Sequence, residues 1–314
     1  MNNIIKQKND TYTNTFPNLY YKGTINPLDK RINTNLITIN SKFRNNYYST
    51  TSSDFIFDFP FELKNVVSLR VTDIQLPSEI YNISSSLGNN FFLIKNETTF
   101  EVKKIIIPNG FYSNAGIIDF LNNLFSNFTD DFKHIHFMIN NDNGETIIGV
   151  KSTAPYIYNF TLEFDNDFIE NIFSDITKQT KYSNDNALLT KFGWLLGFRY
   201  SMYEGKSVYV SEGLIETQQY NLFLCIDDFN DNQFNNKYNV FNNSTLLTNN
   251  IVSQIYLNYI NTTNLKINSI TKTYFGGTNI NKIHIKLIDI FGRVVSLNNN
   301  DFSFTILIEK IYKL

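Results

Sequence analysis

The sequence predicts a mainly β protein: an antiparallel sandwich of one or two jelly-roll-like modules with a few inserted short helices. Three observations lead to this fold class. Apolar and polar residues alternate with period two in many short segments, which is typical of half-buried strands. These segments follow one another in runs without regular β–α alternation, which disfavours a parallel doubly wound sheet. Hydrophobic residues make up 42% of the 314 residues, which is enough apolar surface for a packed core.

The first predicted strands lie between residues 54 and 107. Phenylalanines alternate with mostly polar residues in the segment 54–61. In the segment 65–77, Val67, Leu69 and Val71 share one face, and the apolar phase then shifts to Ile74 and Leu76. A shift by one residue indicates a β-bulge. Segments 91–94 and 99–107 form the next expected pair, which ends at the turn residues Pro108-Asn109-Gly110.

Helical spacing of apolar residues appears in three places. The clearest helix is expected at about residues 114–128, where Ser113 or Asn114 can cap the first turn. Its apolar stripe is the core-facing side of a helix that lies on a sheet. Two shorter helices are expected at 167–176 and 186–196, and Gly197 is placed to end the second.

Strands resume after the first helix. Segments 132–139 and 145–150 are expected to form a hairpin around the turn 141–144. The cleanest alternation is in the segment 157–164, where Tyr158, Phe160, Leu162 and Phe164 should face the core and the polar residues between them should face water. Later strands are expected at 207–211, 218–227, 251–257, 282–290 and 301–311.

This pattern suggests a division of the chain into four parts. Residues 1–35 show no sustained period and are expected to form an extended N-terminal arm. Residues 36–165 would be a first β module with the one amphipathic helix, residues 166–205 a helical connection, and residues 206–314 a second β module.

Composition excludes several classes of function. The chain has 27 basic and 29 acidic residues, for a formal charge of -2, so no excess of positive charge is present for bulk binding of nucleic acid. Cys225 is the single cysteine, which rules out an intramolecular disulfide and fits a reducing compartment. The first 20 residues lack the apolar segment of a secretory signal, and no stretch is long and apolar enough to span a membrane. We therefore expect a protein that is not secreted.

Each candidate for chemistry has a simpler explanation. His134 and His136 have a spacing that can chelate a metal on one strand face, but a third ligand is needed and nothing brings His284 close. Cys225 lies within an apolar strand and is expected to be an inert buried thiol. Asp227 and Asp228 are adjacent on a strand, so their side chains should point to opposite faces. We expect no catalytic residues, no metal site, no cofactors and no enzymatic activity.

The order of several short motifs adds a resemblance that covers about residues 36–311. The motifs are DFIFDFP at 54–60, LKNVVSL at 63–69, IQLP at 74–77, YNI at 81–83, IPNGFYS at 107–113, LLGF at 195–198, IKLID at 285–289 and FSFT at 302–305. In this order they resemble an uncharacterised family of structural proteins encoded by mimivirus-like large nucleocytoplasmic DNA viruses. Asn occurs 48 times, and this composition is similar to coding from an AT-rich viral genome.

The resemblance implies a virion component, of the minor capsid or penton type, with jelly-roll modules and no catalytic residues to carry over. Its partners would be other capsid proteins, among them the major capsid protein or copies of itself, and assembly would take place in the host cytoplasm. Two alternatives stay open at this point. One is a host-attachment or glycan-binding fibre-type module, whose partner would be a host receptor or glycan. The other is a carbohydrate-active enzyme, because paired carboxylates carry no short motif.

Overall fold

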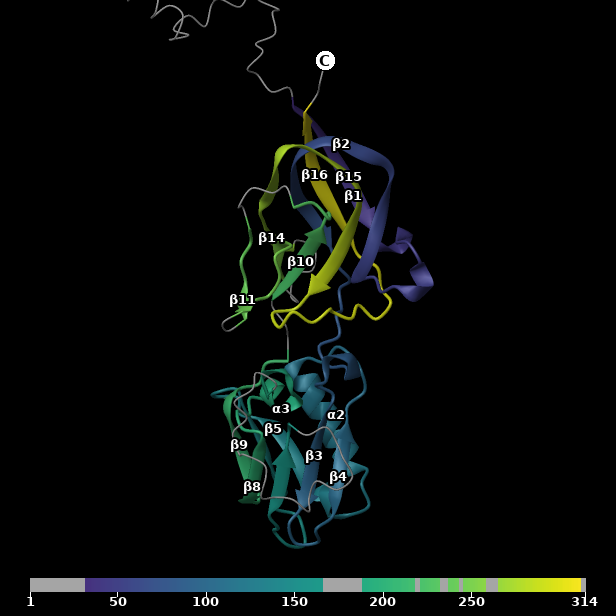
Figure 1. Cartoon of the computed structure of the whole chain (residues 1–314). Helices are drawn as coiled ribbons and strands as arrows, with labels where there is room; N and C mark the ends of the chain where they lie inside the picture. The colour runs from purple at the N-terminus through teal and green to yellow at the C-terminus, as the bar shows by residue number, and fades with distance from the viewer. Residues whose placement is uncertain are drawn as a thin grey trace, which may run out of the picture.

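The structure is a computed structural model that describes residues 32–165, 188–217, 221–231, 237–242, 245–257 and 265–311. Figure 1 shows two bodies joined end to end. We call the first the terminal lobe, which comprises the described parts of residues 32–80 and 221–311. The second is the inserted lobe, residues 81–217 in their described parts. Every pairing between the described strands is antiparallel, and the helices are few and short, so the predicted fold class is confirmed.

The terminal lobe is built on one seven-stranded sheet. Its strand order is β1-β16-β2-β15-β10-β13-β14. The sheet curls so that β13 and β14 return against β2, and its inner face holds one hydrophobic core. The strands are β1 (Ile32–Asn40), β2 (Asp54–Gln75), β10 (Asn221–Asp227), β13 (Ile251–Tyr256), β14 (Lys266–Ser269), β15 (Thr271–Ile288) and β16 (Ser303–Ile311), and a short hairpin joins β11 (Phe241–Asn242) to β12 (Thr245–Leu246).

The long strand β2 contains the bulge that the sequence predicts. Val71 pairs with Ile306 and Asp73 pairs with Thr305, so Thr72 is the extra residue. The apolar phase shifts there because one additional residue turns every later side chain to the opposite face. A second irregularity lies at Val67, between the pairs of Val66 and Ser68. It explains why Val66 is fully buried and Val67 only half-buried.

The inserted lobe contains two smaller sheets. One has the order β4-β3-β7-β8 and the other the order β5-β6-β9. Between them lies a second core, rich in phenylalanine, whose rings include a stacked pair of Phe92 and Phe192 with centroids 5.5 Å apart. The strands are β3 (Phe91–Asn96), β4 (Val102–Ile106), β5 (Ile135–Ile139), β6 (Glu145–Val150), β7 (Phe160–Glu163), β8 (Met202–Lys206) and β9 (Val208–Leu214).

Helix α2 (Asn114–Ser126) covers the core of the inserted lobe, as expected from its apolar stripe. The Ser113 hydroxyl accepts a hydrogen bond from the amide of Gly116 at 3.1 Å and so caps the first turn. The region expected as a helix at 186–196 holds the 3-10 helix η8 (Leu188–Thr190) and the four-residue helix α3 (Phe192–Leu195). Gly197 follows with φ of 94°, in the left-handed region where a helix ends. The helix expected at 167–176 lies outside the described residues.

Strand β7 differs in part from its prediction. Tyr158, Phe160, Leu162 and Phe164 are buried in the core, as expected. The polar residues Thr161 and Glu163 on the opposite face were expected to face water, but they are also buried. β7 is a central strand between β3 and β8, and the Thr161 hydroxyl donates to Glu97 Oε1 at 2.9 Å. A polar side chain is buried there because it has a partner.

The pairing of strands does not follow the expected division near residues 166–205. β1 and β2 come from the expected first module, yet they pair with β15 and β16 from the expected second. The inserted lobe interrupts this sheet between β2 and β10. Sequence order alone does not say which strands pair, because antiparallel partners can be far apart in the chain. The expected arm, residues 1–35, also extends too far along the chain, because Ile32 to Asn35 belong to strand β1.

Hydrogen bonds between described residues join the lobes. Arg293, in the turn after β15, donates from Nη1 to the carbonyl of Leu87 at 2.8 Å, and its Nε donates to Asp289 at 2.8 Å. Asn298 donates from Nδ2 to the hydroxyl of Tyr81 at 2.6 Å. Within the ranges described above, no helix combines the length and apolar character needed to cross a membrane.

Candidate functional site

The connection between β1 and β2 presents aromatic side chains to solvent. We call residues 41–50 the aromatic loop; it contains the 3-10 helices η2 (Ser41–Phe43) and η3 (Tyr47–Ser49). Phe43 is 74% exposed and Tyr48 is 100% exposed. Large aromatic side chains lose favourable burial when they stand free in water, so their exposure on an ordered loop needs a reason.

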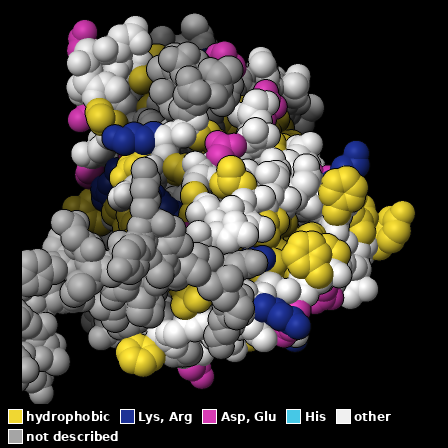
Figure 2. Space-filling model, turned by 90° about the horizontal axis from the view of Figure 1, so that it is seen from above, with side chains coloured by type: hydrophobic (Ala, Val, Ile, Leu, Met, Phe, Trp, Pro, Cys, Tyr) yellow, Lys and Arg dark blue, Asp and Glu magenta, His cyan; other side chains and the backbone are white. Residues whose placement is uncertain are grey.

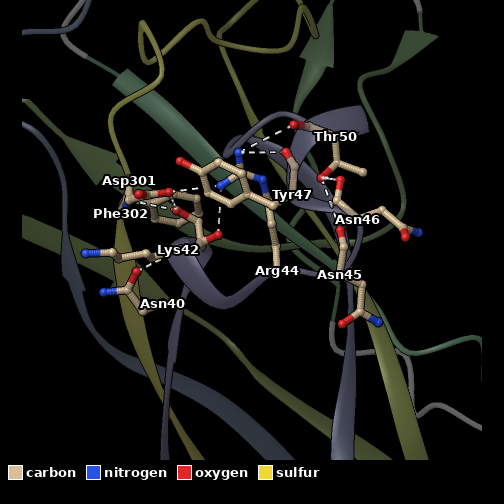
Figure 3. A network of polar contacts seen from close by, with 10 residues as sticks. Asn40, Lys42, Arg44, Asn45, Asn46, Tyr47, Thr50, Asp301 and Phe302 are labelled. Atoms are coloured by element: carbon tan, nitrogen blue, oxygen red, sulfur yellow. Dashed lines mark hydrogen bonds and ion pairs between the residues drawn. The ribbon is translucent and has the colours of Figure 1, made fainter.

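The side chain of Arg44 holds this loop in place (Figure 3). Its side chain is only 6% exposed. Nη1 donates to the carbonyl of Ser41 at 2.9 Å and to Asp301 Oδ1 at 3.0 Å, and the guanidinium carbon lies 3.9 Å from the centroid of the Tyr47 ring. Nη2 donates over longer distances to the carbonyls of Tyr47 and Thr50. One buried cation thus ties together both ends of the loop and the segment before β16.

Further hydrogen bonds connect the loop to its neighbours. Ser41 donates from its amide to the carbonyl of Phe302 at 2.9 Å, and its hydroxyl donates to Asp301 Oδ1 at 2.8 Å. The side-chain amide of Asn45 donates to Asp58 of β2. The backbone that carries Phe43 and Tyr48 is therefore ordered before any partner binds. A surface that is already ordered loses less conformational entropy on binding.

Figure 2 views the terminal lobe from above and shows several hydrophobic side chains gathered at its right edge. The aromatic loop lies on this side of the lobe in Figure 1. Exposed apolar groups that cluster in this way mark interaction surfaces more often than isolated ones do.

The inserted lobe carries a second exposed apolar surface on the outer face of the β5-β6-β9 sheet. Met138, Ile147 and Val210 form one row across the three strands, and Val208 follows on the same face. Met138, Val208 and Val210 are each exposed by close to half. Leu214 extends the face at the end of β9. Both lobes therefore have an apolar surface suited to contact with another protein.

The outer face of the terminal sheet is hollowed by a polar pocket of about 290 Å³. Its floor is formed by register partners on β10 and β15: Asp227 lies opposite His284, and Cys225 lies opposite Lys286. The wall includes Leu247, Thr248, Asn250, Ile288 and Gly292.

A close contact with Asp54 holds the histidine at the edge of this pocket. His284 Nε2 lies 2.7 Å from Asp54 Oδ1, and Lys286 Nζ lies 3.9 Å from Asp54 Oδ2. Burial raises the pKa of the Cys225 thiol to about 12, with Lys286 acting weakly in the opposite direction. The thiol is therefore protonated near neutral pH and is a poor nucleophile. The hydroxyl, amide, imidazole and carboxylate groups around the pocket suit hydrogen bonding to a polar ligand.

The residues that sequence analysis weighed for chemistry are dispersed. His134 ends the 3-10 helix η5 (Asp131–His134), and His136 lies on β5 with Nδ1 2.8 Å from the carbonyl of Gly149. The two histidines do not share a strand face, because the helix ends between them. In the described part of the chain, no group of three His, Cys, Asp or Glu side chains is arranged to hold a metal.

Asp227 and Asp228 point to opposite faces, as expected. Asp227 is the last residue of β10 and lines the pocket. Asp228 turns inward and forms an ion pair with Lys272 of β15. Neither this pair nor the contact between His284 and Asp54 could be found from motifs, because the partners lie 44 and 230 positions apart in the chain.

Comparisons with known proteins give likeness to solved structures but no match among family models or curated proteins. Among solved structures, the chain is similar to the crystal structure of the mavirus penton protein, with 12% sequence identity and a TM-score of 0.36. The match covers 90% of this chain and 100% of the penton protein chain.

Proposed function

We propose that the chain is a structural protein of a virion, of the minor capsid or penton type, which acts through protein–protein contacts. The observation that carries this proposal is the aromatic loop, whose exposed Phe43 and Tyr48 stand on a backbone fixed by the buried Arg44. The motif order described above points in the same direction. The proposal assigns the chain no enzymatic activity.

Aromatic residues on a rigid support suit the centre of a protein interface. Tyr, Trp and Arg are enriched among the residues that contribute most to binding, and aromatic rings supply large contact areas with few rotatable bonds. Tyr48 also has a hydroxyl that can donate or accept a hydrogen bond. We propose that the partners are other capsid proteins, the major capsid protein or further copies of this chain, and that assembly occurs in the host cytoplasm.

The charge of the chain is compatible with packing of like subunits. With a formal charge of -2 over 314 residues, identical or similar chains repel one another only weakly. The exposed sheet face with Met138, Val208 and Val210 gives the inserted lobe a second surface for such contacts.

Incorporation into particles tests the proposal. Tagged wild-type chain and the double variant Phe43→Ser/Tyr48→Ser would be expressed during infection, and purified particles would be analysed by quantitative mass spectrometry. We expect wild type at a defined copy number and the double variant at a level at least about tenfold lower, which corresponds to a loss of about 1.4 kcal/mol of contact energy. Phe100→Ser is the matched control, because Phe100 is 71% exposed in the inserted lobe.

The outcomes separate clearly. Circular dichroism should show that all variants keep the wild-type fold, because exposed side chains contribute little to folding. Absence of the wild-type chain from purified particles would overturn the proposal. Equal incorporation of wild type and the double variant would remove the aromatic loop as its basis.

The polar pocket favours a second candidate function, the binding of a host glycan. Asp227, Asn250 and Thr248 offer the carboxylate, amide and hydroxyl groups that pair with sugar hydroxyls, and Leu247 and Ile288 offer apolar contact. Binding to a glycan array by wild type, and its loss in Asp227→Asn, would support this function. No binding by wild type at micromolar concentration would dismiss it.

A further inference from the structure

We infer that the side chains of Lys272 and Asp228 join in an intramolecular isopeptide bond, which forms without an external enzyme. Lys272 Nζ and Asp228 Oδ1 are in direct contact. The Asp228 side chain is 0% exposed and that of Lys272 is 5% exposed. The inference is independent of the proposed function, since it concerns the chemistry of the core of the terminal lobe.

Burial makes this contact reactive. Two charges removed from water are costly even when paired. The proposed reaction begins with the transfer of one proton from the ammonium to the carboxylate. The products of that transfer are an amine and a carboxylic acid. These neutral forms, unlike the ion pair, can condense to an amide. Exclusion of solvent also protects the product from hydrolysis.

The turn after β10 directs Asp228 into the core. Phe229 has φ of 58°, a left-handed conformation that bulky residues rarely adopt. The amide of Phe229 donates to Asp227 Oδ1 at 2.9 Å, and the side-chain amide of Asn230 donates to the Asp228 carbonyl at 2.9 Å. Strained backbone persists only where its surroundings fix it, and it concentrates at functional positions. Here it holds the carboxyl group against the amine.

Tyr274 supplies a proton donor beside the reacting carboxyl group. Its side chain is buried, and its hydroxyl has no hydrogen-bond partner among the described residues. Burial, together with the neighbouring Asp228 carboxylate, raises the pKa of this hydroxyl above its usual value. Lys272 Nζ lies 5.9 Å from the centroid of the same ring. A protonated hydroxyl at this place can donate to the carboxyl oxygen as negative charge develops on it.

The reaction balances without any co-reactant. The proton moves from Lys272 Nζ to the carboxylate, and the lone pair of the neutral nitrogen attacks Asp228 Cγ. A bond forms between Nζ and Cγ, the bond between Cγ and one oxygen breaks, and this oxygen leaves as water with two protons. The net change is one ammonium plus one carboxylate to one secondary amide plus one water. No electron is gained or lost.

Such a bond would fasten two distant parts of the terminal sheet. Asp228 follows β10, whereas Lys272 lies near the start of β15, beside Leu69 of β2. The two residues are 44 positions apart. A covalent link over this separation limits the unfolded chain in the same way as a disulfide, and it does so in a chain that has only one cysteine.

Intact mass of the purified full chain under denaturing conditions tests the inference. We expect a mass lower than that of the unmodified sequence by one water molecule. Because an aspartate can also lose water by forming a succinimide, proteolytic mapping must follow. It should yield a branched peptide that joins the segments around positions 228 and 272. An unmodified wild-type mass, or a water loss found in a linear peptide, would overturn the inference.

Variants add independent readouts. Lys272→Arg should have the unmodified mass, and Asp228→Asn should lose ammonia in place of water if the same bond forms. Tyr274→Phe should reach the linked mass at least about tenfold more slowly, since a lost donor to developing charge costs this much or more. Lys286→Arg is the matched control, because Lys286 pairs with Asp54 at an exposed site; it should show the wild-type mass. Retention of the water loss in Lys272→Arg would refute the assignment of the bond.

Discussion

Replacement of Arg44 by alanine tests whether the aromatic loop is held by one buried cation. The guanidinium makes two short hydrogen bonds, to the Ser41 carbonyl at 2.9 Å and to Asp301 at 3.0 Å. It also stacks on Tyr47. We expect Arg44→Ala to release residues 41–50 locally while the rest of the terminal lobe stays folded.

The magnitude follows from what each partner loses. A hydrogen bond to a charged group contributes about 1.5–3 kcal/mol. Asp301 is 24% exposed, so water can replace part of its interaction, and the Ser41 carbonyl keeps its bond from the Arg44 amide. Two such bonds would contribute about 3–6 kcal/mol in sum, and these compensations reduce the expected contribution to about 2–4 kcal/mol.

Hydrogen exchange followed by mass spectrometry measures this local effect. The amide of Ser49, which donates to Asn46 at 2.9 Å, reports opening of the loop. At about 1.4 kcal/mol per factor of ten, its exchange should accelerate roughly 30- to 1,000-fold in Arg44→Ala. Arg44→Lys keeps the charge but not the planar fork, so its exchange should lie between wild type and Arg44→Ala.

Lys42→Ala serves as the control, because Lys42 is exposed on the same loop. Its exchange should match wild type within a factor of about 2, the equivalent of the usual surface effect of up to about 0.5 kcal/mol. If Arg44→Ala behaves like Lys42→Ala, the loop is not fixed by Arg44 and the argument for a preordered interface fails.

Three further predictions concern packing and the thiol. Phe160→Ala should lower the free energy of unfolding by about 3–5 kcal/mol. Thr161→Val should lower it by about 1 kcal/mol, because the hydrogen bond to Glu97 is lost. If denaturant unfolding shows a larger loss for Thr161→Val than for Phe160→Ala, the packing of β7 described above is contradicted. Gly197→Ala should lower the melting temperature, because φ is 94° and a Cβ would lie 2.2 Å from the Gly213 carbonyl oxygen; an unchanged melting temperature would exclude this contact. The pKa of Cys225 is raised from 9.0 to about 12, so the thiol should resist iodoacetamide at pH 8 until urea unfolds the chain. Its contribution to the stability of the fold should be lost as pH rises from 9 toward 12. Rapid alkylation of the folded protein would show that the thiol is accessible and ionised.

Local patterns in the sequence predict local structure well here. The phase shift between Val71 and Ile74 predicts a bulge, which the structure has at Thr72. Ser113 and Asn114 predict a helix start, and Ser113 is the residue that caps α2. Each depends on residues a few positions apart, whose relation is set by the period of the strand or helix. The same reasoning placed Asp227 and Asp228 on opposite faces.

Features that depend on residues far apart in the chain cannot be predicted from local sequence patterns. β1 has little apolar period because, as an edge strand, most of it is exposed, and the sequence therefore predicts an arm for its first residues. Thr161 is polar and was expected in water, but its partner Glu97 comes from another strand connection. The pocket likewise requires the register of β10, β15 and β2, which brings Asp54 beside His284.

The insertion of one lobe into the sheet of the other sets an order of folding during synthesis. All the described strands around the core of the inserted lobe lie between residues 81 and 217, so this lobe can fold as soon as it leaves the ribosome. β2 must wait for β15 and β16, whose residues emerge after those of the inserted lobe. Until then the apolar face of β2 has no partner, and the long loop closure slows its pairing. The nascent chain therefore passes through a stage with a finished inserted lobe and an open terminal sheet, which is the stage most exposed to aggregation or to capture by a chaperone.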